Sequence, residues 1–132
     1  MTERPPLSKT EWRIMNHCWR LGKATARQVW ERSLEQHDRD YQTVKTLLDR
    51  ITAKGYLQVE KLGNLCLYTP TVERRAAAGE AVQEFVDVVL DKALAPIFVY
   101  LAEKEDLSQE ELETLERLLE REESREERRD RG

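Results

Sequence analysis

Apolar residues recur at helical spacing in successive segments near the start of the chain. In the first segment they recur every three or four positions between Trp12 and Trp19, and Gly22 follows. Ser8 and Glu11 have the spacing of a capping box, in which each side chain accepts a hydrogen bond from the other residue's backbone N–H. The pattern therefore predicts a helix that begins after Ser8 and ends before Gly22.

A second helix is predicted from about Thr25, with Val29, Trp30 and Leu34 on its buried side. The polar run 36–39 that follows it indicates a loop. Because Trp30 and the two tryptophans of the first segment recur at helical spacing, we interpret all three as core residues. The alternative is that these tryptophans stack on nucleic-acid bases, but helical spacing favours positions on the buried faces of the helices.

The third helix is predicted to begin at Asp40, a residue type that is favoured as a helix N-cap. Its apolar positions follow the i, i+3, i+4 and i+7 pattern of an amphipathic helix and are Val44, Leu47, Leu48 and Ile51. Gly55 closes the helix, and Lys54 before it places a cation at the negative end of the helix dipole.

The segment after the third helix predicts a pair of antiparallel strands. Residues 56–61 and 65–69 are strand-like, Gly63 and Asn64 form a turn between them, and Pro70 ends the second strand. Three helices followed by a hairpin is the element order of a winged helix-turn-helix domain. The predicted fold class is therefore mainly α with a small β hairpin.

The character of the sequence changes after the hairpin. Residues 72–94 predict one long helix, which Pro96 must break or kink. Ser108 and Glu111 repeat the capping-box spacing and open a last helix. The final residues are almost wholly Glu and Arg, either as a solvated helix end or as a disordered segment. We predict three parts: a winged-helix DNA-binding domain at 1–70, a helical dimerisation domain at 71–120 and a charged tail at 121–132.

The helices after the hairpin carry more apolar surface than thin helices leave exposed in a monomer. This excess predicts a homodimer in which two copies cover each other's apolar faces. The residues expected at that interface are Val82, Phe85, Val86, Val89, Leu112, Leu115 and Leu119.

The net charge of −4 is unevenly distributed along the chain. Residues 1–70 hold 12 Lys and Arg against 8 Asp and Glu, whereas residues 71–132 hold 10 against 18. The basic first part suits a polyanion, and the acidic second part does not. No apolar run approaches the roughly eighteen residues of a membrane span, and the two cysteines form no CxxC pair. A cytoplasmic, reduced protein without a membrane partner is expected.

Catalytic and metal-binding patterns are missing from the sequence. We find no G-x-S-x-G, P-loop, H-E-x-x-H or glycine-rich nucleotide motif, so an enzyme is not expected. His17 and Cys18 are adjacent and point about 100° apart on a helix, which does not suit one shared ion. Cys66 and His37 are remote in sequence. We therefore predict neither a metal site nor a cofactor.

The polar face of the third helix is the strongest candidate binding surface. Turning the apolar stripe inward exposes amide, hydroxyl and cationic side chains, which suit base edges and phosphates in DNA. The predicted DNA-binding residues on this helix are Tyr41, Gln42, Thr43, Lys45, Thr46 and Arg50. Lys61 and Asn64 at the hairpin tip would contact the DNA backbone or minor groove. The alternatives are an ordinary solvated helix face and, for Asn64, a turn-forming role.

Four stretches of the chain resemble the penicillinase-repressor family of bacterial regulators, the BlaI, MecI and CopY type: residues 7–19, 41–57, 68–70 and 103–108. The first stretch reads Leu7-Ser8-x-x-Glu11-Trp12-x-Ile14-Met15-x-x-x-Trp19. The most specific reads Tyr41-x-Thr43-Val44-x-Thr46-Leu47-Leu48-x-Arg50-Ile51-x-x-Lys54-Gly55-Tyr56-Leu57.

The resemblance implies a homodimer with one winged helix per subunit and intertwined C-terminal helices. Such dimers bind inverted-repeat operators and repress transcription, which implies a double-stranded DNA operator as partner. The penicillinase-type members are inactivated by a sensor protease that cuts near an Asn-Phe bond, where this chain has Tyr100-Leu101. Copper-responsive members carry a C-terminal C-x-C cluster, and this chain has no cysteine after Cys66.

The function predicted from the sequence is therefore a dimeric DNA-binding repressor that is released by an unidentified induction signal, with proteolysis in the dimerisation region as one form of it. The alternative is a winged-helix adaptor that binds proteins and does not read DNA sequence, because one fold serves several functions.

Overall fold

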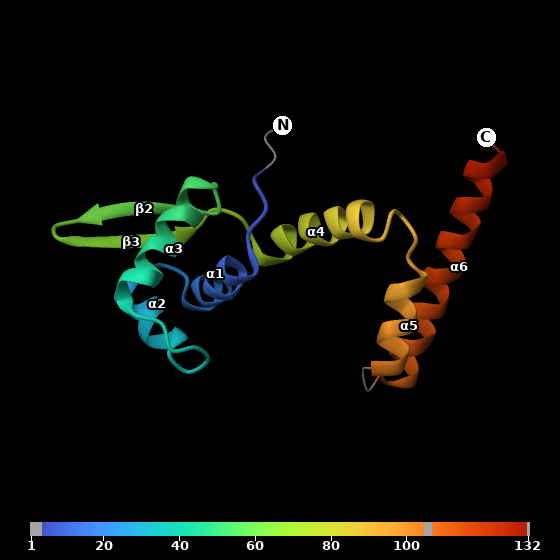
Figure 1. Cartoon of the computed structure of the whole chain (residues 1–132), viewed down its shortest axis with the longest axis horizontal. Helices are drawn as coiled ribbons and strands as arrows, with labels where there is room; N and C mark the ends of the chain where they lie inside the picture. The colour runs from blue at the N-terminus through green and yellow to red at the C-terminus, as the bar shows by residue number, and fades with distance from the viewer. Residues whose placement is uncertain (1–3, 105–106, 132) are drawn as a thin grey trace. The chain divides into compact units, whose positions relative to one another are not determined.

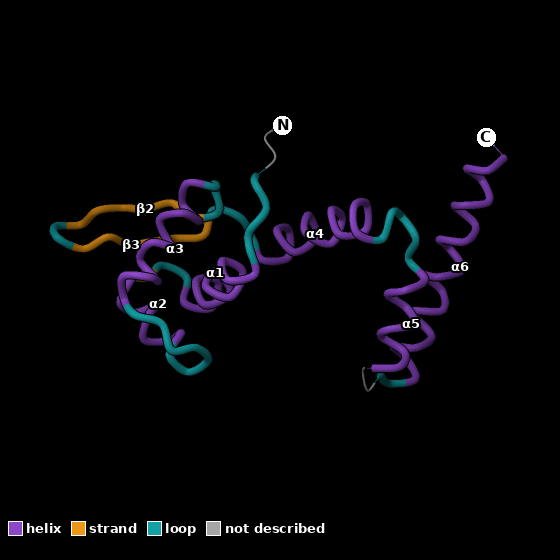
Figure 2. Tube along the Cα trace, viewed as in Figure 1, coloured by secondary structure: helices purple, strands orange, loops and turns teal. Residues whose placement is uncertain are grey.

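The computed structural model describes residues 4–104 and 107–131, with the side chains of 104, 119 and 122–131 excepted. The predicted interface residue Leu119 therefore lies outside the described side chains. The chain divides into two compact units between Ala81 and Val82. Figure 1 shows the order of the elements along the chain, and Figure 2 shows that helices predominate in both units while the strands belong to the first.

Three helices form the body of the first unit: α1 (Lys9–Leu21), α2 (Ala26–Ser33) and α3 (Tyr41–Ala53). The predicted capping box of α1 is confirmed, because Glu11 N–H donates to Ser8 Oγ and Ser8 N–H donates to Glu11 Oε1. The prediction that Asp40 caps α3 is also confirmed, since Thr43 N–H donates to its carboxylate at 2.7 Å. After α3 the chain turns at Gly55, where φ is +93°.

The sheet has three strands, β1 (Ala24–Thr25), β2 (Leu57–Leu62) and β3 (Leu65–Pro70), in the order β1-β3-β2. The predicted hairpin of β2 and β3 is confirmed, with Gly63 at φ +62° in its turn. Strand β1 was not predicted. It is two residues long and exists because it pairs with β3 across a long sequence separation, a contact that leaves no periodic signal.

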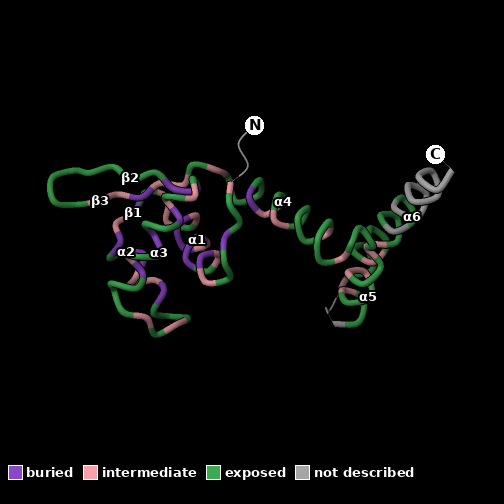
Figure 3. The backbone as a smooth tube through the Cα atoms, turned by 45° about the horizontal axis from the view of Figure 1, so that its top comes forward, coloured by how far each residue is buried: buried purple, intermediate pink, exposed green. Residues whose placement is uncertain are grey.

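The core of the first unit lies where α1, α2 and α3 meet the base of the hairpin, as the buried segments in Figure 3 show. The predicted apolar stripe of α3 is buried: Val44, Leu47, Leu48 and Ile51 are each at most 6% exposed. Tyr68 from β3 is also fully buried. The three tryptophans, predicted as core residues, are partly buried and pack against this core. The prediction that Leu34 lies on the buried side of the second helix is wrong, because α2 ends at Ser33 and Leu34 is 43% exposed.

The first unit continues beyond the hairpin into α4 (Arg74–Glu84). Ala77 on this helix is 2% exposed, and Arg74 Nε donates to Asn16 Oδ1 at 3.0 Å. Just before α4, the carbonyl of Val72 accepts a hydrogen bond from Trp19 Nε1 at 2.8 Å. These contacts extend the compact unit past residue 70 to Ala81. The assignment of DNA binding to residues 1–70 and of dimerisation to residues 71–120 stays a prediction.

The predicted single helix over 72–94 is wrong at its C-terminal end. Helix α4 ends at Glu84, a π-helical turn follows over Phe85–Val89, and Asp91 and Lys92 have positive φ values of 49° and 66°. The helix therefore ends several residues before Pro96, which lies in the first turn of α5 (Ala95–Lys104). Proline is tolerated there because the first-turn N–H has no partner within the helix.

The last helix, α6 (Gln109–Arg131), begins with the predicted capping box between Ser108 and Glu111. The backbone of α6 includes nearly all of the charged tail at 121–132. Of the two alternatives, a helix end or a disordered segment, the structure has the helix end. No helix among the described residues is long and apolar enough to cross a membrane.

Candidate nucleic-acid interface

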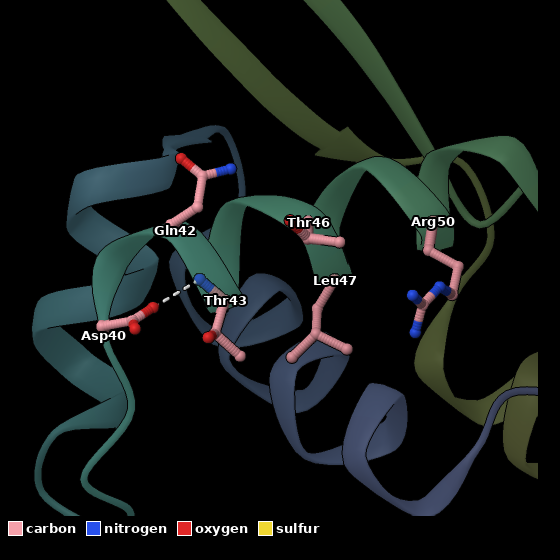
Figure 4. A pocket seen from close by; sticks show the side chains of 6 residues that line it. All are labelled: Asp40, Gln42, Thr43, Thr46, Leu47 and Arg50. Atoms are coloured by element: carbon pink, nitrogen blue, oxygen red, sulfur yellow. Dashed lines mark hydrogen bonds between the residues drawn. The ribbon is translucent and has the colours of Figure 1, made fainter.

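The outer side of α3 presents a shallow hollow lined by residues of this helix and its N-cap. The lining residues are Asp40, Gln42, Thr43, Thr46, Leu47 and Arg50. Figure 4 shows their side chains along α3, with the hydrogen bond between Asp40 and Thr43 dashed. Most of the lining side chains are polar because the apolar stripe of α3 faces the core, and Leu47 of that stripe also lines the hollow.

Three of these side chains are available for an external partner. Gln42, Thr46 and Arg50 are exposed, and none of them hydrogen-bonds or ion-pairs with another residue in the part of the chain that the structure describes. An amide, a hydroxyl and a guanidinium thus lie on successive turns of one helix. Gln can pair with an adenine edge, Thr can contact a thymine methyl or a phosphate, and Arg suits guanine or phosphate.

The N-terminus of α3 combines a helix dipole with a capping carboxylate. The backbone hydrogen bond from Thr43 holds the pKa of Asp40 below its usual value, so the cap is ionised at neutral pH. That negative charge partly offsets the attraction of the helix N-terminus for phosphate. The cationic contribution of this face therefore comes from Arg50 and from neighbouring elements.

Lys45 is engaged within the chain, unlike Gln42, Thr46 and Arg50. It is half-buried, and its Nζ lies 3.0 Å from Asp49 Oδ2 and 5.6 Å from the centre of the Tyr68 ring. Tyr68 Oη also donates to Asp49 Oδ1 at 2.8 Å. The hydrogen bond with Tyr68 and the neighbouring Asp49 raise the pKa of Lys45, so its ammonium is charged but already engaged within the chain.

Tyr41 is exposed at the first turn of α3, as predicted, but its ring is supported by α2. Its ring centre is 6.1 Å from that of Trp30, with the two rings at 90°. Arg27 lies over both rings, and sequence reasoning missed this residue. No pattern within α2 singles out Arg27, because its surroundings depend on how α2 packs against α3.

The hairpin extends Lys61 and Asn64 into solvent at its end, where both are exposed. They share this tip with two apolar residues, Leu62 and Leu65, which are 54% and 57% exposed. The structure thus places the predicted wing residues on one projecting element, separate from the residues of α3.

Of the cysteines and histidines, Cys66 is the cross-strand partner of the wing residue Lys61, whereas Cys18 and His17 are buried in α1. Cys18 is buried in the core, where burial raises the pKa of its thiol to about 12, and Cys66 lies on β3. His17 is buried in α1, where burial lowers its pKa. Within the described ranges, no group of three or more His, Cys, Asp or Glu side chains is placed to hold a metal ion.

Three helices, a hairpin and an exposed third helix with free polar side chains define a winged helix-turn-helix protein. The sequence model of the penicillinase repressor family matches residues 7–121, and the chain belongs to this family.

Two relatives illustrate the range of similarity. The methicillin resistance regulatory protein MecI of Mammaliicoccus sciuri is 30% identical over 113 residues, which cover 86% of this chain and 92% of the relative. The penicillinase repressor of Bacillus licheniformis is 24% identical over 125 residues, which cover 95% of this chain and 98% of the relative.

A solved structure is similar to a little more than half of the chain. The solution structure of the DNA-binding domain of the repressor BlaI matches 56% of this chain and 90% of its own, with 26% identity and a TM-score of 0.50.

Proposed function

We propose that this chain is a transcriptional repressor that binds an inverted-repeat DNA operator as a homodimer. The observation that carries the proposal is the outer face of α3, where Gln42, Thr46 and Arg50 are exposed without partners among the described side chains. Membership of a repressor family supports it, as does the similarity of a little more than half of the chain to the DNA-binding domain of BlaI.

In this proposal α3 enters the major groove and reads base edges with its first turns. Gln42 and Thr46 contact bases. Tyr41 and Thr43, in the first turn of α3, lie close to the DNA backbone at the edge of the groove. Arg50, nearly three turns from the N-cap Asp40, anchors a phosphate. Lys45 contributes charge to this face while Asp49 and Tyr68 hold it, so its part is electrostatic.

The hairpin acts as the wing. Lys61 contacts a phosphate beside the groove, and Asn64 projects from the turn toward the minor groove. Support for this assignment is the exposure of both residues at the tip of an element that extends from the base of α3.

The homodimer forms through the second unit and the end of α4. Four apolar side chains there are largely exposed in a single chain: Val82 at 57%, Phe85 at 45%, Val88 at 71% and Val89 at 65%. Val99 and Tyr100 on α5 are also more than half exposed. A second copy would remove these surfaces from water. The predicted interface residues Val86, Leu112 and Leu115 are half-buried in the single chain.

Proteolytic release, which the family resemblance implies, is proposed for the second unit as a whole. Tyr100 and Leu101, which stand where the related repressors are cut, lie within helix α5. A protease binds extended backbone, so cutting there requires α5 to unwind locally. Cleavage in this unit would separate the dimer and leave α3 untouched.

A salt titration of DNA binding tests the proposed function. The probe is a duplex that the unaltered chain selects from a randomised library, with a mixed-sequence duplex of the same length for comparison. We expect the logarithm of the affinity to fall linearly with the logarithm of the salt concentration, with a slope of about −0.9 per phosphate contact. A chain that selects no sequence and binds neither duplex would be an adaptor for proteins and not a repressor.

A further inference from the structure

Arg27, the second residue of α2, is held in place by two aromatic rings. Its guanidinium carbon lies 5.6 Å from the centre of the Trp30 ring and 6.0 Å from the centre of the Tyr41 ring. The two rings themselves meet edge to face at 6.1 Å. A guanidinium at these distances is attracted to both rings, and the contact restricts the positions that the long side chain can take.

The aromatic support of Arg27 is fixed to the start of α3. Trp30 Nε1 donates a hydrogen bond of 2.8 Å to the carbonyl of Arg39, in the loop that leads into α3. Tyr41 is the first residue of α3 and is followed by Gln42 on the outer face. The position of the Arg27 guanidinium is therefore tied to the end of the helix that we propose enters the groove.

The guanidinium of Arg27 keeps its hydrogen-bonding edge available. Its one ion pair among the described residues joins Nη1 to Glu31 Oε1 at 3.7 Å, and the two side chains are 69% and 58% exposed. Such surface pairs contribute little to stability, so a phosphate can replace the carboxylate at small cost. Contact with aromatic faces leaves the in-plane N–H groups of arginine free to bond two oxygens of one phosphate.

We propose that Arg27 is a DNA-backbone contact that fixes the register of α3 in the groove, an assignment that rests on the proposed function. In helix-turn-helix complexes the helix before the reading helix crosses the backbone, which is where α2 carries Arg27. The contact is to phosphate and carries no base information. Its role is to position the reading face, with Trp30 and Tyr41 holding the guanidinium ready before DNA arrives.

The test compares four full-length chains: unaltered, Arg27→Gln, Arg27→Lys and the control Arg13→Gln. Arg13 is an exposed arginine on α1, and its side chain makes no hydrogen bond or ion pair within the described part of the chain. Affinity for the selected duplex and for the mixed-sequence duplex is measured by fluorescence anisotropy over a range of salt concentrations. Circular dichroism of each chain checks that the fold is intact.

We expect Arg27→Gln to bind both duplexes about tenfold more weakly, because a charge-assisted bond to phosphate is lost. Its salt slope should be shallower by about 0.9 for each bound chain. Arg27→Lys should keep the slope and recover part of the affinity, since an ammonium supplies the charge but not the planar fork. Arg13→Gln should change neither the slope nor the affinity.

An unchanged salt slope in a folded Arg27→Gln chain would overturn the assignment, whatever its affinity, because Arg27 would then only support Tyr41. An equal loss of affinity and of salt slope in Arg13→Gln would overturn it as well, since the effect would then reflect the loss of any surface charge. If the unaltered chain binds neither duplex, the proposed function fails first and this assignment fails with it.

Discussion

The polar side chains of α3 divide into those that are free and those that the chain itself already holds. Thr46 and Arg50 are free, whereas Lys45 and Asp49 hold each other and are tied to Tyr68 on β3. A free side chain can exchange water for DNA without breaking an internal contact. We therefore expect substitutions of Thr46 or Arg50 to change DNA binding alone. Substitutions of Lys45, Asp49 or Tyr68 should change the stability of the domain as well.

Thr46→Ala tests the reading role of the middle of α3. The substitution should weaken binding to the selected duplex by about 1–3 kcal/mol, because a base-edge or tightly held phosphate contact is lost. The melting temperature should stay nearly constant, since Thr46 is exposed and has no partner in the described structure. Anisotropy titration and thermal melting measure the two quantities, and normal binding by the folded variant would remove Thr46 from the interface.

Arg50→Ala tests a different kind of contact on the same helix. If Arg50 anchors a phosphate, its loss should weaken binding to the selected and the mixed-sequence duplex about equally and should make both salt slopes shallower by about 0.9 per chain. Titrations with both duplexes measure this. A loss confined to the selected duplex would show instead that Arg50 reads a base.

At the scale of the elements, a buried ion pair joins the start of α1 to the end of α3. Glu11 is 1% exposed and its Oε1 lies 2.6 Å from Lys54 Nζ, which also donates to the carbonyl of Pro6. Burial raises the pKa of Glu11, but the hydrogen bonds from Lys54 and Ser8 together lower it below its ordinary value of 4.5. The carboxylate thus stays ionised inside the domain because its partners hold it.

Removing Lys54 from this pair should lower the free energy of unfolding more than neutralising Glu11 does. Lys54→Met leaves a buried, uncompensated carboxylate and should reduce the free energy of unfolding by about 3 kcal/mol. Glu11→Gln should cost about 1 kcal/mol, since glutamine still serves the capping box and Lys54 still bonds Pro6. Urea unfolding at neutral pH measures both, and equal losses would contradict a buried pair.

The same pair sets part of the acid sensitivity. A carboxyl whose pKa falls on folding stabilises the fold fully above its unfolded value of 4.5, and this stabilisation is lost as the pH falls through the lower folded value. The unaltered chain should therefore lose stability below pH 4.5 more steeply than Glu11→Gln does. Urea unfolding across that range provides the control for the neutral-pH comparison.

Local signals in the sequence were enough to predict the first three helices, the N-terminal caps of α1, α3 and α6, and the hairpin, but not the Thr25–Gln28 capping box of α2 or the end of α4. The capping boxes at Ser8 and Ser108 and the cap at Asp40 depend on residues three positions apart, which a sequence shows directly. The contacts of Lys45 and Asp49 with Tyr68, and that of Arg27 with Tyr41, depend on how different elements pack together. Helical periodicity shows which side chains face outward, but it does not show which outward side chains are held by a neighbouring element.

At the scale of the whole chain, the two units differ in how they satisfy their apolar residues. The first unit buries its apolar stripe among its own elements, and Ala77 of α4 belongs to that core. The second unit leaves Val88 and Val89 about two-thirds exposed, although they are as apolar as the core of the first. We therefore expect the first unit to fold alone, and in the proposed homodimer the apolar surface of the second unit would be covered by a second copy.

A fragment that ends after Ala81 should separate these two requirements. It retains Ala77 and the Trp19–Val72 hydrogen bond, so it should fold, and it should be monomeric because Phe85 and the apolar residues beyond it are gone. Two half-site contacts on one dimer act at a high effective concentration, so the fragment should bind a full palindrome about 10²-fold more weakly than the intact chain. Its base preference should not change, because α3 is intact.

A second fragment that ends after Pro70 serves as the matched comparison. It lacks Val72, Arg74 and Ala77, which all contact the rest of the first unit, so it should melt at a lower temperature than the longer fragment. Light scattering gives the mass of each fragment, and titration with a full palindrome and a single half-site gives the affinities. Dimerisation of the longer fragment, or full-site affinity equal to that of the intact chain, would show that the second unit does not link two reading helices. In that case, cleavage of the second unit would have no physical route to weaken operator binding.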